Sequence, residues 1–271
     1  NSGNNIFVYY LFRTVGTVSH PSNNALTATT GTFSDAVTIN DGDAGSVTAN
    51  TVADELVVES SGAGGMSILT PDASDANLFL GGPGANAGAI VRWNDDSNLI
   101  SIGTNNSGGT MALKIGGFTD ALTIDANGHI SKPLQSAFFA QPSSQQANIA
   151  LTGETIAFGT EIFDQNGDFS SNTFTAPITG RYQLQDMVRA DNVDSAANFC
   201  RIVIQTSNRN HIAGMIDPAV LSSDPGEWNF VGVVLTDMDA NDTAIITWSQ
   251  SGGAAQTDIE TDTFFSGYLV A

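Results

Sequence analysis

Between residues 36 and 130, apolar and polar side chains alternate in short segments separated by glycine, asparagine, aspartate and serine. None of these segments shows the i, i+3, i+4, i+7 spacing of an amphipathic helix. Alternation with a period of two over so few residues is typical of β-strands that bury one face. Strands are therefore predicted at residues 36–39, 46–52, 55–59, 66–69, 77–80, 89–93, 98–103, 110–115, 121–125 and 129–131.

The pattern changes at Pro133, where the apolar segments lengthen and aromatic residues become frequent. The spacing of turn residues beyond this point predicts about eight strands in a β-sandwich or jelly roll. We expect residues 133–271 to form this head and residues 23–132 to form a repetitive β-shaft. Residues 1–22 are expected to be the end of an upstream β domain whose beginning is missing. The predicted fold class is all-β.

The predicted strands of the shaft have little to bury within one chain. Each offers two or three apolar side chains to one face, as Leu56 and Val58 do. Burying an aliphatic side chain contributes about 2 kcal/mol, so one segment gains about 4–6 kcal/mol. Ordering five residues costs at least about 5–10 kcal/mol, which offsets that gain. Association of several identical chains along one axis would supply the missing apolar surface, and a slender shaft of several chains is expected.

Charge restricts the possible partners. Acidic residues outnumber basic ones by 28 to 8, and the formal net charge is −20 at pH 7. Proteins that bind nucleic acid by neutralising phosphates need clustered lysine and arginine, so this class is excluded. The same charge disfavours binding to an anionic membrane surface. No stretch approaches the ~18 apolar residues of a membrane-spanning helix, so no membrane insertion is expected.

Five segments of the predicted head follow one another in a recognisable order. They are Phe-Phe-Ala at 138–140, Phe-Asp-Gln-Asn-Gly-Asp-Phe at 163–169, Phe-Thr-Ala-Pro-Ile-Thr-Gly-Arg-Tyr-Gln-Leu at 174–184, Gly-Val-Val-Leu at 232–235 and Phe-Phe-Ser-Gly-Tyr-Leu at 264–269. Over residues 134–271, this order resembles the trimeric jelly rolls of the complement globular-head and tumour-necrosis-factor family. Asn241, where glycine is usual, and a long acidic segment before the last strand depart from the family pattern. The aromatic residues assigned to the core and the trimer interface are Phe138, Phe174, Tyr182, Phe230, Trp248, Phe265 and Tyr268.

Motifs in the first half point to a second resemblance. They are Thr-Val-Gly-Thr-Val-Ser-His-Pro at 14–21, Leu-Thr-Ala-Thr-Thr-Gly-Thr-Phe-Ser at 26–34, Val-Thr-Ala-Asn-Thr-Val at 47–52 and Leu-Thr-Ile-Asp-Ala-Asn-Gly-His-Ile at 122–130. Residues 15–132 are similar to the repetitive fibre segments of tailed bacteriophages. The resemblance implies a homotrimeric tail fibre of the virion, extracellular, whose head binds a polysaccharide or protein on the host surface. Other tail or baseplate proteins would bind through the missing N-terminal part.

Patterns for catalysis or metal binding are weak. The three histidines lie far apart and Gly-x-Ser-x-Gly is absent. Cys200 has no partner for a disulfide, and its alternating apolar surroundings predict a small buried side chain. Residues 164–168 begin like a calcium loop but lack its later glycine and glutamate, so a turn is preferred. Asp258, Glu260 and Asp262 are interpreted as a solvated acidic rim, with a cation on a threefold axis as the alternative. We expect no enzyme activity, cofactor or metal.

The order of strands predicts which loops lie at the far end of the head. If the last strand returns to the shaft, antiparallel succession places residues 207–227 and 250–263 at the far end. It places residues 191–198 and 237–242 beside the shaft. Long loops on a rigid scaffold often carry binding residues. The predicted receptor-binding residues are Asn208, Arg209, Asn210, His211, Asp224, Trp228, Gln256 and Asp258.

Two other functions fit the same pattern. The chain could be a head fibre or capsid decoration protein in which the head mainly drives trimerisation. It could also be a secreted bacterial adhesin. Binding of the head to host cells separates the tail fibre from the decoration protein, and a secretion signal in the full-length gene would favour the adhesin.

Overall fold

The computed structural model describes residues 37–42, 44, 45 and 47–271. The predicted upstream domain at residues 1–22 lies outside the described residues, as does the beginning of the predicted shaft. The described chain consists of β-strands and turns, and its one helical element is the single turn η1 (Pro218–Val220). No helix of this part is long and apolar enough to cross a membrane. The prediction of an all-β fold is confirmed.

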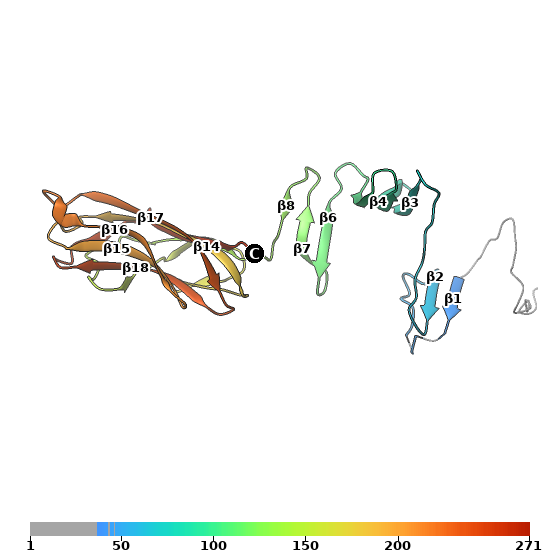
Figure 1. The fold of residues 1–271 in the computed structure, drawn as a ribbon, viewed down its shortest axis with the longest axis horizontal. Helices are drawn as coiled ribbons and strands as arrows, with labels where there is room; N and C mark the ends of the chain where they lie inside the picture. The colour runs from blue at the N-terminus through green and yellow to red at the C-terminus, as the bar shows by residue number, and fades with distance from the viewer. Residues whose placement is uncertain (1–36, 43, 46) are drawn as a thin grey trace, which may run out of the picture. The chain divides into compact units, whose positions relative to one another are not determined.

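Before residue 136 the described chain forms three small sheets (Figure 1). Strands β1 and β2 pair in parallel, β3, β4 and β5 form the second sheet, and β6, β7 and β8 form an antiparallel third. The strands of each sheet are consecutive in the sequence. Their bounds are β1 (Val37–Asp41), β2 (Leu56–Ser60), β3 (Asp75–Gly82), β4 (Ala85–Asn94), β5 (Leu99–Thr104), β6 (Met111–Ile115), β7 (Thr119–Ile124) and β8 (Ile130–Ser131).

Two strands predicted in this part are wrong. At residues 46–52, the described residues after 46 are exposed, and they end in a turn. There the Asn50 carbonyl accepts a bond from the Ala53 N–H, and the Asn50 side chain accepts one from the Val52 N–H. Asparagine favours turns because its side chain competes for backbone donors. Residues 66–69 are exposed and pair with no strand of the described chain.

None of the described residues from 37 to 135 is buried. Large apolar side chains are open to solvent there, with Leu69 90 % exposed, Phe118 85 % and Ile102 61 %. The alternation of apolar and polar positions is present, but nothing in the described part of the chain covers the apolar faces that it creates. Soluble proteins rarely expose extended apolar surface, so these sheets offer surface suited to association.

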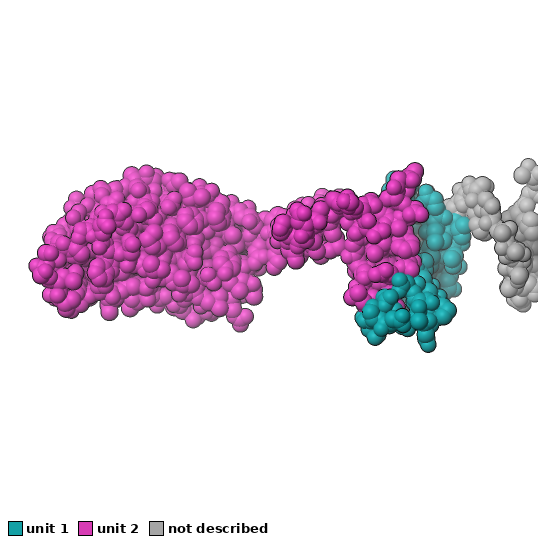
Figure 2. Space-filling model, turned by 90° about the horizontal axis from the view of Figure 1, so that it is seen from above, with its two compact units in different colours: residues 1–76, 94–98 teal, residues 77–93, 99–271 magenta. Residues whose placement is uncertain are grey.

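The chain divides into two compact units, which Figure 2 shows in different colours. The first consists of residues 1–76 and 94–98, and its described part contains β1 and β2. The second consists of residues 77–93 and 99–271 and contains every strand from β5 onward. All buried residues of the described chain belong to the second unit, at or beyond Ser136. We call residues 133–271 the head.

The head is a sandwich of two antiparallel sheets. One sheet has the order β11-β9-β20-β14-β17, with β19 beside β14, and the other has the order β12-β13-β18-β15-β16, with β10 beside β18. The pairs are nested, because β9 pairs with β20, β13 with β18, β14 with β17 and β15 with β16. Nested pairing of this kind is the topology of a jelly roll, so this prediction is confirmed.

The strands of the head have the following bounds. They are β9 (Ala137–Gln141), β10 (Glu154–Thr155), β11 (Thr160–Asp164), β12 (Phe169–Ser170), β13 (Thr173–Thr175), β14 (Gly180–Asp191), β15 (Phe199–Thr206), β16 (Asn210–Ile216), β17 (Glu227–Met238), β18 (Thr243–Ser251), β19 (Asp258–Ile259) and β20 (Phe264–Leu269).

Aromatic side chains fill the space between the two sheets. Phe138 stacks on Phe174 with ring centroids 4.8 Å apart and meets Phe265 edge-on at 5.0 Å. Tyr182 is fully buried, and its hydroxyl donates to the Ile178 carbonyl at 2.7 Å. Six residues predicted for the core or interface are buried in one chain, namely Phe138, Phe174, Tyr182, Phe230, Trp248 and Phe265, whereas Tyr268 is 44 % exposed.

The head has a root end, where the chain enters it, and an opposite far end. Strand β20 returns to the root end, as predicted, because the Leu269 N–H donates to the Ser136 carbonyl at 3.0 Å. Strand β14 begins at the root end and reaches the far end at Asp191, which lies opposite Glu227 and Asp258. The connections at the far end are residues 142–153, 192–198, 217–226 and 252–263.

Candidate binding site at the far end of the head

Four of the predicted receptor-binding residues lie at the root end of the head, so their predicted placement is wrong. The Asn208 side chain donates to Asp242 at 2.6 Å, and Arg209 forms an ion pair of 2.8 Å with Asp237. Both acidic partners belong to the β17–β18 turn region, which lies at the root end as predicted. The four misplaced residues are Asn208, Arg209, Asn210 and His211.

The error comes from one strand that the sequence pattern does not reveal. The sequence predicts a single connection over residues 207–227, but β16 lies inside this range, runs back antiparallel to β15 and reverses the direction of the chain. For the same reason residues 191–198 lie at the far end rather than at the root end. Strand β16 is an edge strand, and its pairing with β15 shifts register between Ile202 and Val203. Such an irregularity disturbs the period-two pattern by which a strand is recognised.

The other predicted residues lie at the far end, where a hydrogen-bonded group joins three connections. We define the far-end cluster as Asn192, Ser195, Asp224, Gln256 and Asp258. The Ser195 N–H donates to Asp224 Oδ1 at 2.8 Å, and Gln256 Nε2 donates to Asp224 Oδ2 at 2.8 Å. Asn192 Nδ2 donates to Asp258 Oδ2 at 3.1 Å. The cluster therefore holds residues 192–198, 217–226 and 252–263 together.

The two acidic side chains of the cluster, Asp224 and Asp258, already accept hydrogen bonds from other residues of the chain. Hydrogen bonds from Ser195, followed by that from Gln256, lower the pKa of Asp224, so this carboxylate is ionised near neutral pH. Asp258 Oδ1 also accepts the Asn148 N–H at 2.8 Å. Trp228 is half-buried and packs against the core rather than standing free at the rim. These side chains position the far-end loops, and the surface around them is what a ligand can reach.

The two possible metal sites of the sequence are occupied by other interactions. Asp164 accepts the backbone N–H groups of Gly167 and Asp168 at 3.1 and 3.0 Å, as expected for a turn. Glu260 accepts a bond from Gln145, and Asp262 pairs with Arg189 at 3.3 Å. Within the described residues, no group of three or more His, Cys, Asp or Glu side chains could hold a metal ion.

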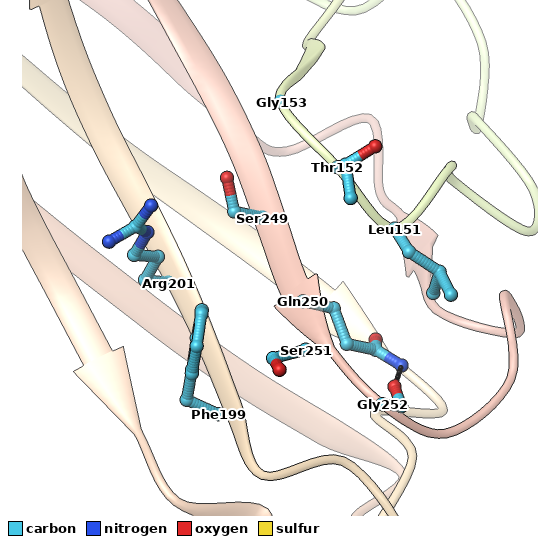
Figure 3. Close-up of a pocket in the computed structure, with 9 residues that line it drawn as sticks. All are labelled: Leu151, Thr152, Gly153, Phe199, Arg201, Ser249, Gln250, Ser251 and Gly252. Carbon is cyan, nitrogen blue, oxygen red and sulfur yellow. Dashed lines mark hydrogen bonds between the residues drawn. The ribbon is translucent and has the colours of Figure 1, made fainter.

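A pocket that the sequence does not reveal opens on the outer face of the β15–β18 sheet (Figure 3). Its volume is about 630 Å³. Strands β15 and β18 form its floor, with Arg201 opposite Ser249 and Phe199 opposite Ser251. Residues 151–153, in the connection before β10, line the pocket on the side of β18 away from β15. The lining residues are Leu151, Thr152, Gly153, Phe199, Arg201, Ser249, Gln250, Ser251 and Gly252.

The outer face of the other sheet is apolar along its edge strand. Val231, Val233 and Leu235 point outward from β17 and are 62 %, 63 % and 59 % exposed. Tyr268 of β20 is exposed on the same face, and its hydroxyl donates to Gln183 at 3.1 Å. We call the surface formed by Val231, Val233, Leu235 and Tyr268 the apolar face.

Comparisons with solved structures cover about half of this chain. The structure is similar to the globular domain of zebrafish complement 1qA protein, with 14 % identity, coverage of 51 % of this chain and 98 % of that one, and a TM-score of 0.39. It is also similar to murine APRIL in crystals at pH 8.5 and pH 8.0, with 9 % and 10 % identity and TM-scores of 0.37 and 0.35. Each APRIL comparison covers 50 % of this chain and 99 % of the other. No family model and no curated protein matches the sequence. The assignment of a jelly roll rests on the nested strand pairing.

Proposed function

We propose that the chain is one subunit of a homotrimeric bacteriophage tail fibre, with a β-shaft before residue 133 and a head that binds the host-cell surface. The observation that carries this proposal is the contrast between the two parts. No described residue from 37 to 135 is buried, whereas the head encloses a core within one chain. A shaft without a core of its own needs partner strands, and identical copies supply them at every level along an axis.

The apolar face is proposed as the contact between heads of neighbouring copies. Three outward side chains of one strand, Val231, Val233 and Leu235, are each more than half exposed. Copies of the chain are already beside one another if they share a shaft, so a second copy is the occupant at highest local concentration. Covering this face would remove apolar surface from water, which stabilises the contact by about 25 cal/mol for each Å² buried.

The far end is proposed as the surface that meets the host. The chain enters the head at the root end, so the connections at the opposite end of the head are the most remote from this entrance. The far-end cluster holds three of them in place, and loops on a rigid scaffold commonly carry recognition. Three copies of a weak site on one trimer bind a repetitive surface far more tightly than a single copy does.

Attachment of the full chain to bacteria tests this proposal. The fluorescently labelled protein is incubated with a panel of bacterial isolates, and bound fluorescence is measured by flow cytometry. We expect binding to a subset of strains. Replacing residues 254–258 by glycine and serine should abolish it, whereas the same replacement at residues 208–211, at the root end, should leave it unchanged. If no strain binds, or if only the 208–211 variant loses binding, the proposed function of the far end is wrong.

A further inference from the structure

The pocket on the β15–β18 sheet contains an arginine without an acidic partner. Arg201 makes no ion pair with any described residue, and its Nε atom is buried without a hydrogen-bond partner. By contrast, Arg189 pairs with three carboxylates and Arg209 pairs with Asp237. Because no carboxylate of the described chain pairs with Arg201, its guanidinium can pair with an acidic ligand.

Arg201 is also held in place. Its guanidinium lies over the Phe199 ring, 5.3 Å from the ring centroid. Both side chains project from the outward positions of β15, and β18 supports them from the adjacent strand. A guanidinium stacked on an aromatic ring loses little further freedom when it binds a planar anion through its two parallel N–H groups. This geometry suits a carboxylate.

Three of the nine lining residues carry hydroxyl groups, namely Thr152, Ser249 and Ser251. No acidic residue of the described chain lines the pocket. Hydroxyls can donate to and accept from a polyhydroxylated ligand, and the carbon atoms of Phe199 and Leu151 can contact the apolar face of a sugar ring. The volume of about 630 Å³ falls within the ordinary range for small-molecule sites.

Two glycines shape the mouth of the pocket. Gly153 and Gly252 have φ angles of +63° and +77°, a left-handed conformation that other residues adopt at a cost. Both lie in connections at the far end of the head, where the chain is remote from its point of entrance. The pocket therefore opens beside the surface that we propose meets the host.

We propose that this pocket binds a carboxylate-bearing sugar, such as a uronic acid residue of a surface polysaccharide. Arg201 would hold the carboxylate, and Thr152 and the two serines of β18 would contact the sugar hydroxyls. This inference rests on the proposed function and names the ligand class of the head. The charge of −20 repels anions at long range, but at physiological ionic strength the Debye length is about 8 Å, so charges around the pocket dominate.

The test is isothermal titration calorimetry of the full chain with glucuronate, glucose and N-acetyl-aspartate. Glucuronate is expected to bind with a Kd of ~1 mM, which is usual for a single weak site. Its Kd should be at least about tenfold lower than that of either control ligand. Arg201→Gln should weaken glucuronate binding by at least about tenfold, and Arg201→Lys, which keeps the charge but loses the paired N–H groups, should weaken it less. The control is Arg181→Gln, which removes an exposed arginine from the other sheet and should change nothing.

Each other outcome overturns the inference. Equal binding of glucose would show that the carboxylate is not recognised, and equal binding of N-acetyl-aspartate would show a site for peptide carboxylates instead of sugars. Glucuronate binding that survives in Arg201→Gln would place the sugar elsewhere. The same preparations are tested for attachment to bacteria and for native mass. If attachment persists while glucuronate fails to bind, only the ligand assignment is wrong, and if no strain is bound, the proposed function itself fails.

Discussion

Gln256 donates a hydrogen bond of 2.8 Å to Asp224, although 32 residues separate the two in the sequence. The bond joins the connection before β17 to the connection after β18. Ser195, from a third connection, donates to the same carboxylate. One acidic side chain thus fixes three loops, and the shape of the far end depends on it.

Asp224→Ala is therefore expected to loosen the far end without unfolding the head. The Ser195 amide loses its acceptor, so its hydrogen–deuterium exchange should accelerate by at least about tenfold. Peptides covering residues 252–257 should also exchange faster, because Gln256 loses the same partner. Asn208→Ala, which removes a comparable exposed bond at the root end, is the control. Unchanged exchange of residue 195 in Asp224→Ala would contradict the positioning role.

Much of the sandwich could be predicted from the sequence. In β14, Tyr182, Leu184 and Val188 lie an even number of residues apart, on the inward face of the strand, and all three are buried. Cys200 is likewise buried within an apolar run. Such positions are predictable because inward and outward side chains alternate along a strand whatever its partner is.

What could not be predicted depends on residues remote in the sequence. Strand β16 is not evident from the sequence because its pattern is interrupted. Without this strand, Asn208 and Arg209 are predicted at the far end, although they lie at the root end. The bonds of the far-end cluster join three connections, and no local pattern signals them. The pocket around Arg201 was missed for the same reason, since its wall includes a connection some 50 residues away at residues 151–153.

Asp186 is an inward-facing residue that breaks the apolar pattern of β14. It is completely buried, and neither carboxylate oxygen has a hydrogen-bond partner in the described chain. A Cβ atom on Gly232, opposite Asp186, would come within 2.5 Å of Asp186 Oδ1, so only glycine fits there. Burial raises the pKa of Asp186 from 3.8 to about 7.

The raised pKa of Asp186 predicts a loss of stability as pH rises. The folded state favours the protonated acid, so its contribution is complete below pH 3.8 and disappears as pH rises through about 7. The difference in pKa corresponds to at most about 4 kcal/mol. Asp186→Asn should be more stable than the original chain at pH 8 and should lose less stability between pH 5 and pH 8. Urea denaturation followed by tryptophan fluorescence measures this. If the free energy of unfolding changes with pH in the same way for both proteins, Asp186 is not the group responsible.

Cys200 is expected to be unreactive in the folded protein. It is fully buried, and burial, aided by Asp194, raises the pKa of its thiol to about 12, so the reactive thiolate is scarce. Its thiol contacts Gln250 Oε1 at 3.7 Å. Ellman's reagent at pH 8 should modify less than about one chain in ten within an hour in buffer and every chain in urea. Rapid modification in buffer would show that this part of the core opens.

Val233→Glu is expected to weaken contacts between heads. Val233 is 63 % exposed at the centre of the apolar face, and burying a new carboxylate there against its copies would cost both desolvation and repulsion. When the native mass is measured at serial dilutions, the variant should dissociate at a higher protein concentration than the original chain does. Ile212→Glu, at a residue 56 % exposed on edge strand β16 of the other sheet, is the matched control. Equal effects of the two substitutions would exclude the apolar face as the specific contact.

The native mass of the purified full chain tests the central claim most directly. The described shaft buries no residue, so a well-folded single chain is not expected to persist in dilute solution. Light scattering coupled to size-exclusion chromatography should give about 84 kDa, three times the 28.1 kDa of one chain. A folded species of 28.1 kDa at micromolar concentration, with exchange-protected shaft strands, would contradict the proposal that three copies cover one another.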